Sequence, residues 1–245
     1  MKSKESKYWD GLAALGPEAS VIDPNDKRGV KNAYIKFLRD EQIWTIFNTL
    51  ENDSLVLDFG CGSGNISSYL SNMGLRTIGI DISIELLKLA SNNVNKEVSN
   101  FIHYDGKSIP IESNQFSGAV TYVVLSYITE DDELKNILKQ ILCSLKPGAK
   151  FVVIEQTKGK AKICDDGNKL QRTKKSYIDI FSEIGFKVNQ TKDIRSGHFL
   201  FLYALRYGLM GKKSFVRLKN IEKKLIKLIP IPKFDYRETL FVLSK

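Results

Sequence analysis

Three glycines follow an acid at alternating positions in residues 55–64, which read LVLDFGCGSG. The acid is Asp58, and the glycines are Gly60, Gly62 and Gly64. Glycine lets the chain turn sharply and lets a ligand approach the backbone, and a helix that begins after such a turn offers free amide N–H groups. The pattern therefore predicts a ligand-binding loop between a buried strand and a helix that begins near Asn65.

Two further acids follow the next two apolar segments. Asp81 ends the segment TIGID, 23 residues after Asp58, and Asp105 lies in HYDGKSIP. An acid at the tip of the second strand is placed to accept hydrogen bonds from both hydroxyls of a ribose. Asp105 can accept a hydrogen bond from an exocyclic amine such as adenine N6. Ligands of open α/β sheets bind at the carboxyl ends of the strands, so the three acids predict a nucleoside site there.

The spacing of the glycines bears on which nucleoside binds. Dinucleotide-binding loops read G-x-G-x-x-G, with helix amides facing a pyrophosphate. This chain reads D-x-G-x-G-x-G, and Asp58 beside the loop would repel a pyrophosphate but would suit an ammonium group. A nucleoside joined to an amino acid without phosphate, S-adenosylmethionine, meets these requirements.

The elements that must position these residues follow from the periodicity of the apolar residues. Runs of strand length alternate with helical patterns of about ten residues, which indicates βαβ units and a parallel sheet covered by helices. The strand runs are 55–57, 77–80, 101–103, 118–124 and 150–154, and the helical patterns are 66–73, 84–95 and 133–145. The last pattern ends at Lys146-Pro147-Gly148, a strong stop signal.

The flanking regions are less regular. Residues 30–50 have the pattern of an amphipathic helix, 176–184 that of a helix, and 186–192 and 239–244 those of strands. We expect an N-terminal helical cap at 1–53, a ligand-binding domain at 54–195 and 238–245, and an insertion at 196–237 that caps an acceptor site.

Four segments carry a resemblance to a known family. They are DFGCGSG at 58–64, GIDIS at 79–83, HYDGKSIPIESNQFSGAVTYVVLSYI at 103–128 and LKPGAKFVVIE at 145–155. In this order the chain resembles the class I S-adenosylmethionine-dependent methyltransferases, in particular the ubiquinone and menaquinone C-methyltransferase group. The resemblance implies an α/β fold with a Rossmann-like doubly wound sheet. That sheet is mostly parallel with an antiparallel last strand. A helical N-terminal segment and an insertion between the last two strands are added to it.

The resemblance also implies a cofactor, S-adenosyl-L-methionine, with S-adenosyl-L-homocysteine as product, and a set of residues around it. The glycine loop and Asp58 line the methionyl and ribose part, Asp81 binds the ribose, and the backbone at Tyr122 faces the methionyl amino group. Ile82 packs on the adenine, and Asp105 and the Gly106 amide meet its edge. The implied cofactor-binding residues are Asp58, Gly60, Gly62, Gly64, Asp81, Ile82, Asp105, Gly106 and Tyr122.

The sequence does not single out a catalytic base, which a hydroxyl acceptor would need. Candidates are His198 in SGHFLF, Tyr127 after the fourth strand and Glu155 at the end of the fifth, and each also has a purely structural interpretation. We do not expect Cys61 to act as a nucleophile. With two histidines and three cysteines without CxxC spacing, we expect no metal. Residues 121–125, TYVVL, lack the Asn/Asp-Pro-Pro-Tyr/Phe motif of DNA, RNA and protein-glutamine N-methyltransferases.

The chain is strongly basic, because it has 37 Lys and Arg residues against 28 Asp and Glu residues and a net charge of +9. Such a surface favours anionic partners. Residues 211–230 hold seven Lys or Arg and one acid, Glu222, and their apolar residues at 216, 221, 225 and 228 recur at helical spacing. This basic amphipathic helix could lie on an anionic membrane surface, bind an acidic acceptor, or pack its apolar stripe on the core with its lysines in water.

These observations favour a methyltransferase that acts on a small molecule or glycan, by O-methylation, with an acceptor that can be anionic. An RNA methyltransferase, suggested by the charge but lacking an appended RNA-binding module, and a catalytically inactive S-adenosylmethionine-binding protein remain alternatives. Transfer to carbon or nitrogen and the oligomeric state stay open. No apolar run is long enough to cross a bilayer and the N-terminus lacks a secretory signal, so we expect a cytoplasmic protein, membrane-peripheral if the basic helix contacts lipid.

Overall fold

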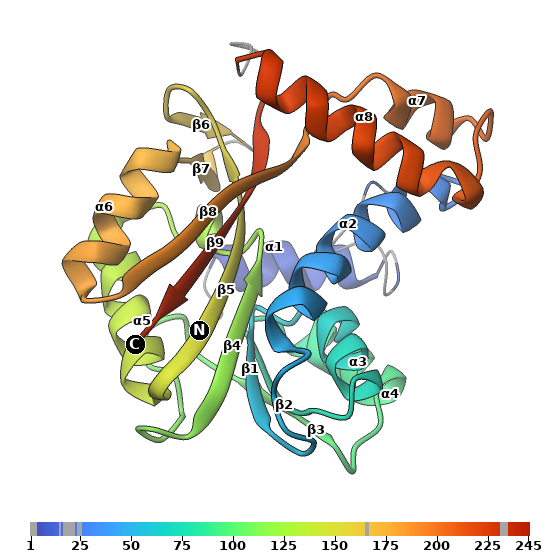
Figure 1. Ribbon diagram of the computed structural model, residues 1–245. Helices are drawn as coiled ribbons and strands as arrows, with labels where there is room; N and C mark the ends of the chain where they lie inside the picture. The colour runs from blue at the N-terminus through green and yellow to red at the C-terminus, as the bar shows by residue number, and fades with distance from the viewer. Residues whose placement is uncertain (1–3, 15, 17–22, 24–25, 165–166, 231–234) are drawn as a thin grey trace.

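A computed structural model of the chain describes residues 4–14, 16, 23, 26–164, 167–230 and 235–245. Its main feature is a seven-stranded sheet with the order β3-β2-β1-β4-β5-β9-β8 (Figure 1). The strands are β1 (Leu55–Phe59), β2 (Arg76–Asp81), β3 (Ser99–His103), β4 (Phe116–Tyr122), β5 (Leu145–Thr157), β8 (Lys187–Ser196) and β9 (Arg237–Ser244). Strand β9 pairs antiparallel with both β5 and β8, and the other pairs of the sheet are parallel. The predicted doubly wound sheet with an antiparallel last strand is confirmed.

Helices cover both faces of the sheet because the strands alternate their apolar side chains between the faces. On one face, Leu57 and Phe59 of β1 pack with α5 (Asp131–Ser144) and α6 (Lys174–Ile184). On the other face, Val56 packs with α2 (Val30–Phe47) and α3 (Asn65–Asn72). The remaining helix of the βαβ units is α4 (Ile84–Asn93), which lies beside α3 (Figure 1).

The strand register brings the predicted ligand-binding segments to one edge of the sheet. Asp58 of β1 lies opposite Gly79 of β2, and Asp81 at the end of β2 lies opposite His103 of β3. A short 3₁₀ turn, η1 (Leu125–Tyr127), follows β4 at the same edge. The loops that follow β1, β2, β3 and β4 therefore meet at the carboxyl end of the parallel strands.

The N-terminal segment and the late insertion also lie at this end. Helix α1 (Lys4–Ala13) packs against α4, and the segment between β8 and β9 forms α7 (Phe201–Arg206), η3 (Lys212–Ser214) and α8 (Phe215–Leu228). These later helices lie together with the first half of α2 at the upper right in Figure 1. A separate core cluster joins them, in which Tyr34 and Leu38 of α2 pack with Leu202, Leu205, Phe215 and Leu218. The boundaries of the cap and the insertion as domains stay a prediction.

Two features differ from the expected elements. A small hairpin of β6 (Lys162–Cys164) and β7 (Lys169–Gln171) follows β5, although the sequence analysis placed no strands there. Strand β5 is longer than expected, because pairing of Thr157 with Arg237 extends it at one end and pairing of Leu145 with Phe116 extends it at the other. Pro147 and Gly148 therefore lie inside the strand, after α5 has ended at Ser144.

The face that α8 turns inward also differs from the expected stripe. The helix buries Phe215, Leu218 and Glu222, whereas Val216 is 57% and Leu228 is 78% exposed. The physical reason is a polar anchor, since the Tyr34 hydroxyl of α2 and the Ser196 amide both donate to the Glu222 carboxylate at 2.8 and 2.7 Å. Among the described residues, no helix combines the length and the apolar character that crossing a bilayer requires.

Candidate functional site

A cavity of about 600 Å³ opens at the carboxyl end of the parallel strands. Its walls come from the loops after β1, β2, β3 and β4, from α1, and from the ends of β5, β8 and β9 that meet at the same edge. A volume of this size is typical of sites that enclose a small-molecule ligand.

The glycine loop adopts backbone conformations that favour glycine. Gly60, Gly62 and Gly64 have φ values of 73°, 53° and 82°. A Cβ on Gly60 would lie 2.3 Å from Val124 Cγ2, so no side chain fits there without moving Val124. Gly60 and Gly62 line the cavity. Gly64 is the N-cap of α3, where a Cβ would lie 2.8 Å from Val94 Cγ2, so its role in the structure is to let α3 pack close to the end of α4.

Asp81 fastens the loop to the end of β2. Its Oδ2 accepts a hydrogen bond from the Gly62 amide and its Oδ1 accepts one from the Ser83 amide, both at 2.8 Å. The side chain lines the cavity, and burial raises its pKa to about 6. Each carboxylate oxygen retains a second lone pair, so Asp81 can still accept hydrogen bonds from two neighbouring hydroxyls of a ligand.

Asp58 lies beneath the loop rather than in the wall of the cavity. Its side chain is buried, Oδ2 accepts a 2.7 Å hydrogen bond from Ser67 Oγ, and burial raises its pKa to about 6. Cys61 is also buried and absent from the cavity wall, and burial raises the pKa of its thiol well above its usual value. Both residues support the loop from below.

The loop after β3 brings Asp105 and Gly106 to the cavity, next to Ile82. Asp105 Oδ1 accepts hydrogen bonds from the Lys107 and Ser108 amides at 2.8 and 2.9 Å, and these bonds hold the pKa of Asp105 below its usual value. The other oxygen, Oδ2, takes part in neither bond and is the atom that a ligand amine can reach.

The residue that follows β4 has a strained backbone, which the sequence did not indicate. Val123 has a φ of 54°, which is a genuine outlier for a β-branched residue. Its amide donates to the Ile154 carbonyl at 2.8 Å, which holds the backbone in place, and the residue lines the cavity beside Tyr122 and Val124. Such strain persists only where the surroundings fix it, and it gathers at ligand-binding sites.

The three candidate bases have different surroundings. Tyr127 lines the cavity, with Lys169 Nζ 4.7 Å from its ring centroid and the Trp9 ring at 4.8 Å. Glu155 is fully buried outside the cavity wall, where it accepts the Leu125 and Ser126 amides and so holds η1. His198 has a side chain 48% exposed and faces Asp235, also away from the wall. The structure thus brings only Tyr127 of the three to the cavity.

A polar cluster in the same wall went unnoticed in the sequence. Arg195 of β8 and Glu238 of β9 form a buried ion pair at 2.5 Å, the Tyr122 hydroxyl donates to the same Glu238 oxygen at 3.2 Å, and Arg195 donates to the Tyr236 hydroxyl at 3.2 Å. Glu238 Oε2 and Arg195 Nε are buried with no hydrogen-bond partner among the described residues. No motif marks these residues, because only the β8–β9 register joins them.

Helix α1 closes another side of the cavity with Tyr8, Trp9 and Leu12. It is tied to the start of α4, since Asp10 Oδ1 accepts hydrogen bonds from Ser83 Oγ at 2.7 Å and from the Glu85 amide at 3.3 Å. No cluster of three or more metal-binding side chains occurs in the part of the chain that the structure describes.

The fold and the cavity define a nucleoside-binding α/β domain, and comparisons with known proteins specify its class. Residues 57–153 match the family described as a methyltransferase domain. A demethylmenaquinone methyltransferase of Renibacterium salmoninarum is 30% identical over 100 residues, 41% of this chain and 40% of the relative. A tRNA (carboxymethyluridine(34)-5-O)-methyltransferase of Arabidopsis thaliana is 28% identical over 120 residues, 49% of this chain and 28% of the relative.

Solved structures show the same fold over more of the chain. The cyclase SpnF has a TM-score of 0.70 at 17% identity, covering 99% of this chain and 96% of that one. Phosphoethanolamine N-methyltransferase 2 of Haemonchus contortus, in complex with S-adenosyl-L-methionine, has a TM-score of 0.64 at 18% identity, covering 84% of this chain and 52% of that one.

These matches confirm the predicted family. Residues 57–153 carry a methyltransferase domain of this family, and the chain has the fold of the class I S-adenosylmethionine-dependent methyltransferases, whose cofactor is S-adenosylmethionine. The chain spans less than half the length of the curated relatives that it matches, between 28% and 49% for the first three.

Proposed function

We propose that this chain binds S-adenosylmethionine in the cavity and transfers its methyl group to a small polar molecule or glycan. The observation that carries the proposal is the meeting of Gly60, Gly62, Asp81 and Asp105 in one wall. Asp81 accepts the ribose hydroxyls, Asp105 and the Gly106 amide meet the adenine edge, and the open backbone at Gly60 and Gly62 admits the methionyl part. The site residues fit this ligand because their carboxylates accept hydrogen bonds and their negative charge attracts a cationic group.

Bound S-adenosylmethionine supplies a methyl group on a positively charged sulfur. The residues of the chain hold the two reactants in position and provide a negative electrostatic potential near the sulfur. Asp58 below the loop and Asp81 beside it add negative charge close to where the sulfonium would lie, and Trp9 with Tyr127 excludes water from one side. Because a sulfonium is already a good leaving group, holding the acceptor in line with the methyl carbon supplies much of the rate.

We assign the acceptor to the other half of the cavity, where Tyr122, Arg195, Tyr236 and Glu238 lie. A hydroxyl acceptor can donate to Glu238 Oε2, which has no partner among the described residues. The new oxygen–methyl bond forms as the methyl–sulfur bond breaks, the sulfur keeps the electron pair, and the hydroxyl proton passes to Glu238. Lys169 also lines the cavity and favours an acceptor that carries a carboxylate or phosphate, whereas Lys31 in the same wall is paired with Asp23 at 2.7 Å.

Calorimetric titration tests the cofactor assignment. We expect S-adenosylhomocysteine to bind at one site per chain, whereas NAD and FAD show no heat above dilution, because the acids of the loop repel a pyrophosphate. Binding of NAD or FAD in place of S-adenosylhomocysteine would refute the assignment.

Turnover tests the acceptor class. The chain is incubated with S-adenosylmethionine and either the small-molecule fraction or the RNA fraction of a cell extract, and released S-adenosylhomocysteine is measured. We expect release with the small-molecule fraction, unchanged by ribonuclease. Release only with RNA, abolished by ribonuclease, would contradict the proposed acceptor.

RNA methylation is the second candidate, because a relative acts on tRNA and this chain has a net charge of +9. A third candidate is a protein that keeps the fold and the cofactor but does not transfer a methyl group, since the fold also occurs in a cyclase and fold alone does not fix the reaction. Binding of S-adenosylhomocysteine without turnover on either fraction would favour that candidate.

A further inference from the structure

Most of the excess positive charge belongs to the segment between β8 and β9. Residues 197–230 hold eight basic residues and one acid, which accounts for +7 of the net charge of +9. The basic residues are Arg206, Lys212, Lys213, Arg217, Lys219, Lys223, Lys224 and Lys227. The acid, Glu222, is buried against Tyr34 and Ser196, so it does not offset the charge at the surface.

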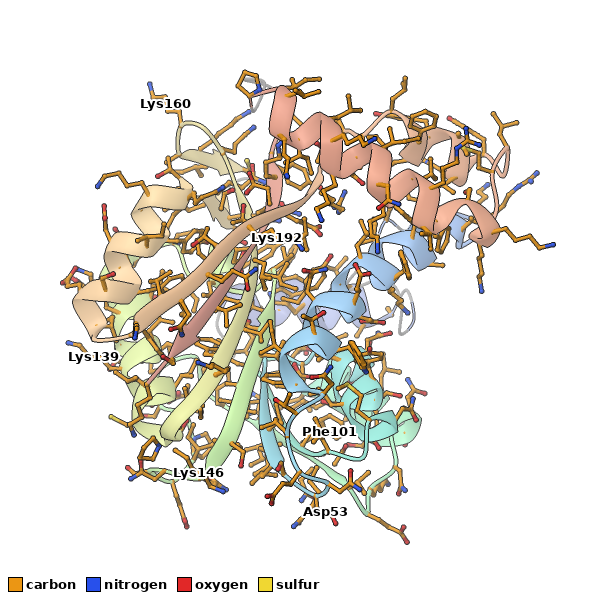
Figure 2. The ribbon with its side chains drawn as sticks, in the orientation of Figure 1. Asp53, Phe101, Lys139, Lys146, Lys160 and Lys192 are labelled. Atoms are coloured by element: carbon orange, nitrogen blue, oxygen red, sulfur yellow. The ribbon has the colours of Figure 1, made fainter. Side chains whose placement is uncertain are left out.

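Within the described part of the chain, most of these cations have no partner of opposite charge. Lys219 pairs with Glu41, and Arg206 lies 3.6 Å from Asp23. The other six are exposed and form no ion pair with the described residues. Figure 2 shows side chains projecting from the outer side of α7 and α8, away from the body of the molecule.

The same segment exposes a concentration of large apolar side chains. Of the twelve that are exposed among the described residues, eight lie between 200 and 229. They are Leu200, Tyr203, Tyr207, Leu209, Val216, Leu225, Leu228 and Ile229. Leu200, Leu209 and Leu228 are 74%, 80% and 78% exposed. A concentration of exposed apolar side chains costs solubility, and it marks an interaction surface.

We propose that this α7–α8 surface, defined by the exposed residues of 200–229, docks on a bilayer that contains anionic lipid. The six unpaired cations would face phosphate headgroups, and the exposed leucines and tyrosines would insert at the boundary with the acyl chains. Six of the eight exposed apolar side chains are aliphatic, which suits hydrocarbon, whereas single-stranded RNA is bound by cations and aromatic stacking.

The α7–α8 segment can remain folded while it docks. Phe215 and Leu218 of α8 pack with Leu38 of α2, so the apolar side chains at the surface are not needed for the core. The segment that carries this surface begins and ends at the cavity, because Gly197 and Tyr236, which flank it in sequence, both line the cavity wall. Docking would therefore bring one side of the cavity close to the headgroups.

Sedimentation with vesicles tests the proposal. The full chain is mixed with vesicles of phosphatidylcholine alone or with phosphatidylglycerol, at low and high salt. We expect binding to the anionic vesicles that weakens as salt rises, and little binding to phosphatidylcholine. A triple variant, Lys223→Gln, Lys224→Gln and Lys227→Gln, should lower the partition coefficient by about 100-fold. The pair Leu209→Ser and Leu228→Ser should lower it as well.

A matched triple variant, Lys139→Gln, Lys146→Gln and Lys160→Gln, removes the same charge from the periphery of other elements, where Figure 2 labels these lysines, and should bind like the parent. Equal loss in both triple variants, or equal binding to both kinds of vesicle, would overturn the proposal. The proposal would also be overturned if the parent bound RNA but not vesicles, and if the triple variant at Lys223, Lys224 and Lys227 lost that RNA binding. Titration with S-adenosylhomocysteine on every variant checks folding and tests the cofactor site separately.

Discussion

At the scale of single residues, the site depends on a few side chains that have two partners each. Asp81 holds the Gly62 amide and the Ser83 amide, so it fixes both the loop after β1 and the start of α4. Gly60 leaves the space that a side chain would take from Val124. The acid and the glycines were predictable because their types and spacing are local in the sequence, although their roles toward the cofactor stay proposals.

Replacing Asp81 by Ala should weaken binding of S-adenosylhomocysteine by about 1–3 kcal/mol, because charge-assisted hydrogen bonds to the ribose are lost. Calorimetric titration measures the change. Asp179→Ala serves as the control, since Asp179 is exposed on α6 and its ion pair is with Lys175 on the same helix. Unchanged affinity in Asp81→Ala would show that the ribose lies elsewhere.

Glu238→Gln should lower the release of S-adenosylhomocysteine with the small-molecule fraction by about 100-fold, because an amide cannot take the proton of the acceptor. The affinity for S-adenosylhomocysteine itself should stay within about twofold of the parent value. A thermal melt checks that the variant folds without its ion pair to Arg195. A parallel loss of cofactor affinity and turnover would instead mean that Glu238 supports the whole cavity.

Burial raises the pKa of Glu222 to about 7. The folded chain therefore keeps this proton at pH values where the unfolded chain has lost it, so stability falls as pH rises from about 4.5 to 7. Glu222→Gln should remove about 3 kcal/mol of that fall, because the Gln Oε1 can still accept from the Ser196 amide while its Nε2 donates to the Tyr34 hydroxyl, and the side chain carries no charge. Urea unfolding of both proteins across this range measures the slope, and equal slopes would contradict the prediction.

At the scale of elements, the strands and helices of the βαβ units were predictable because their apolar periodicity is regular. The β6–β7 hairpin was not, because its strands are three residues long and mostly polar. The inward face of α8 did not follow from its apolar residues for a different reason. Counting apolar residues selected Val216 and Leu228, whereas the buried face is set by Glu222 bonding to Tyr34, 188 residues earlier.

Helix α1 makes a testable contribution to the cavity. In a Trp44→Phe background, Trp9 is the remaining tryptophan, and its fluorescence should change when S-adenosylhomocysteine binds because its ring lies in the cavity wall. Trp9→Ala should weaken binding several-fold without lowering the melting temperature by more than a few degrees, whereas Trp9→Phe should bind nearly as well as the parent. If the Trp9 fluorescence does not change when S-adenosylhomocysteine binds, the ligand lies away from α1.

At the scale of the whole molecule, the doubly wound sheet with an antiparallel last strand was predictable from the family resemblance, whereas the acceptor half of the cavity was not. Its residues come from β4, β8 and β9, which are separated by more than 40 residues in sequence and joined only by strand pairing. Local patterns carry no information about such a pairing. The same reason explains why the resemblance identifies a cofactor but leaves the acceptor to experiment.

Strand β9 is buried along its whole length, and Phe241 packs against Tyr177 and Phe181 of α6 with ring centroids 5.7 and 5.4 Å apart. Phe241→Ala should lower the free energy of unfolding by about 3–5 kcal/mol, measured by urea denaturation. Ile163→Ala, at a residue 63% exposed, should change it by less than about 0.5 kcal/mol. Comparable losses in the two variants would mean that β9 is not central to the core.

The place of β9 has a consequence for synthesis. Within the sheet, β8 has no neighbour other than β9, and β9 also fills the gap beside β5. While a ribosome is still making the α7–α8 segment, β5 and β8 each have an edge of unpaired backbone N–H and C=O groups. Strands of other nascent chains could pair with these edges. The growing polypeptide thus passes through a vulnerable interval of more than 40 residues, in which a chaperone that shields open strands would raise the yield.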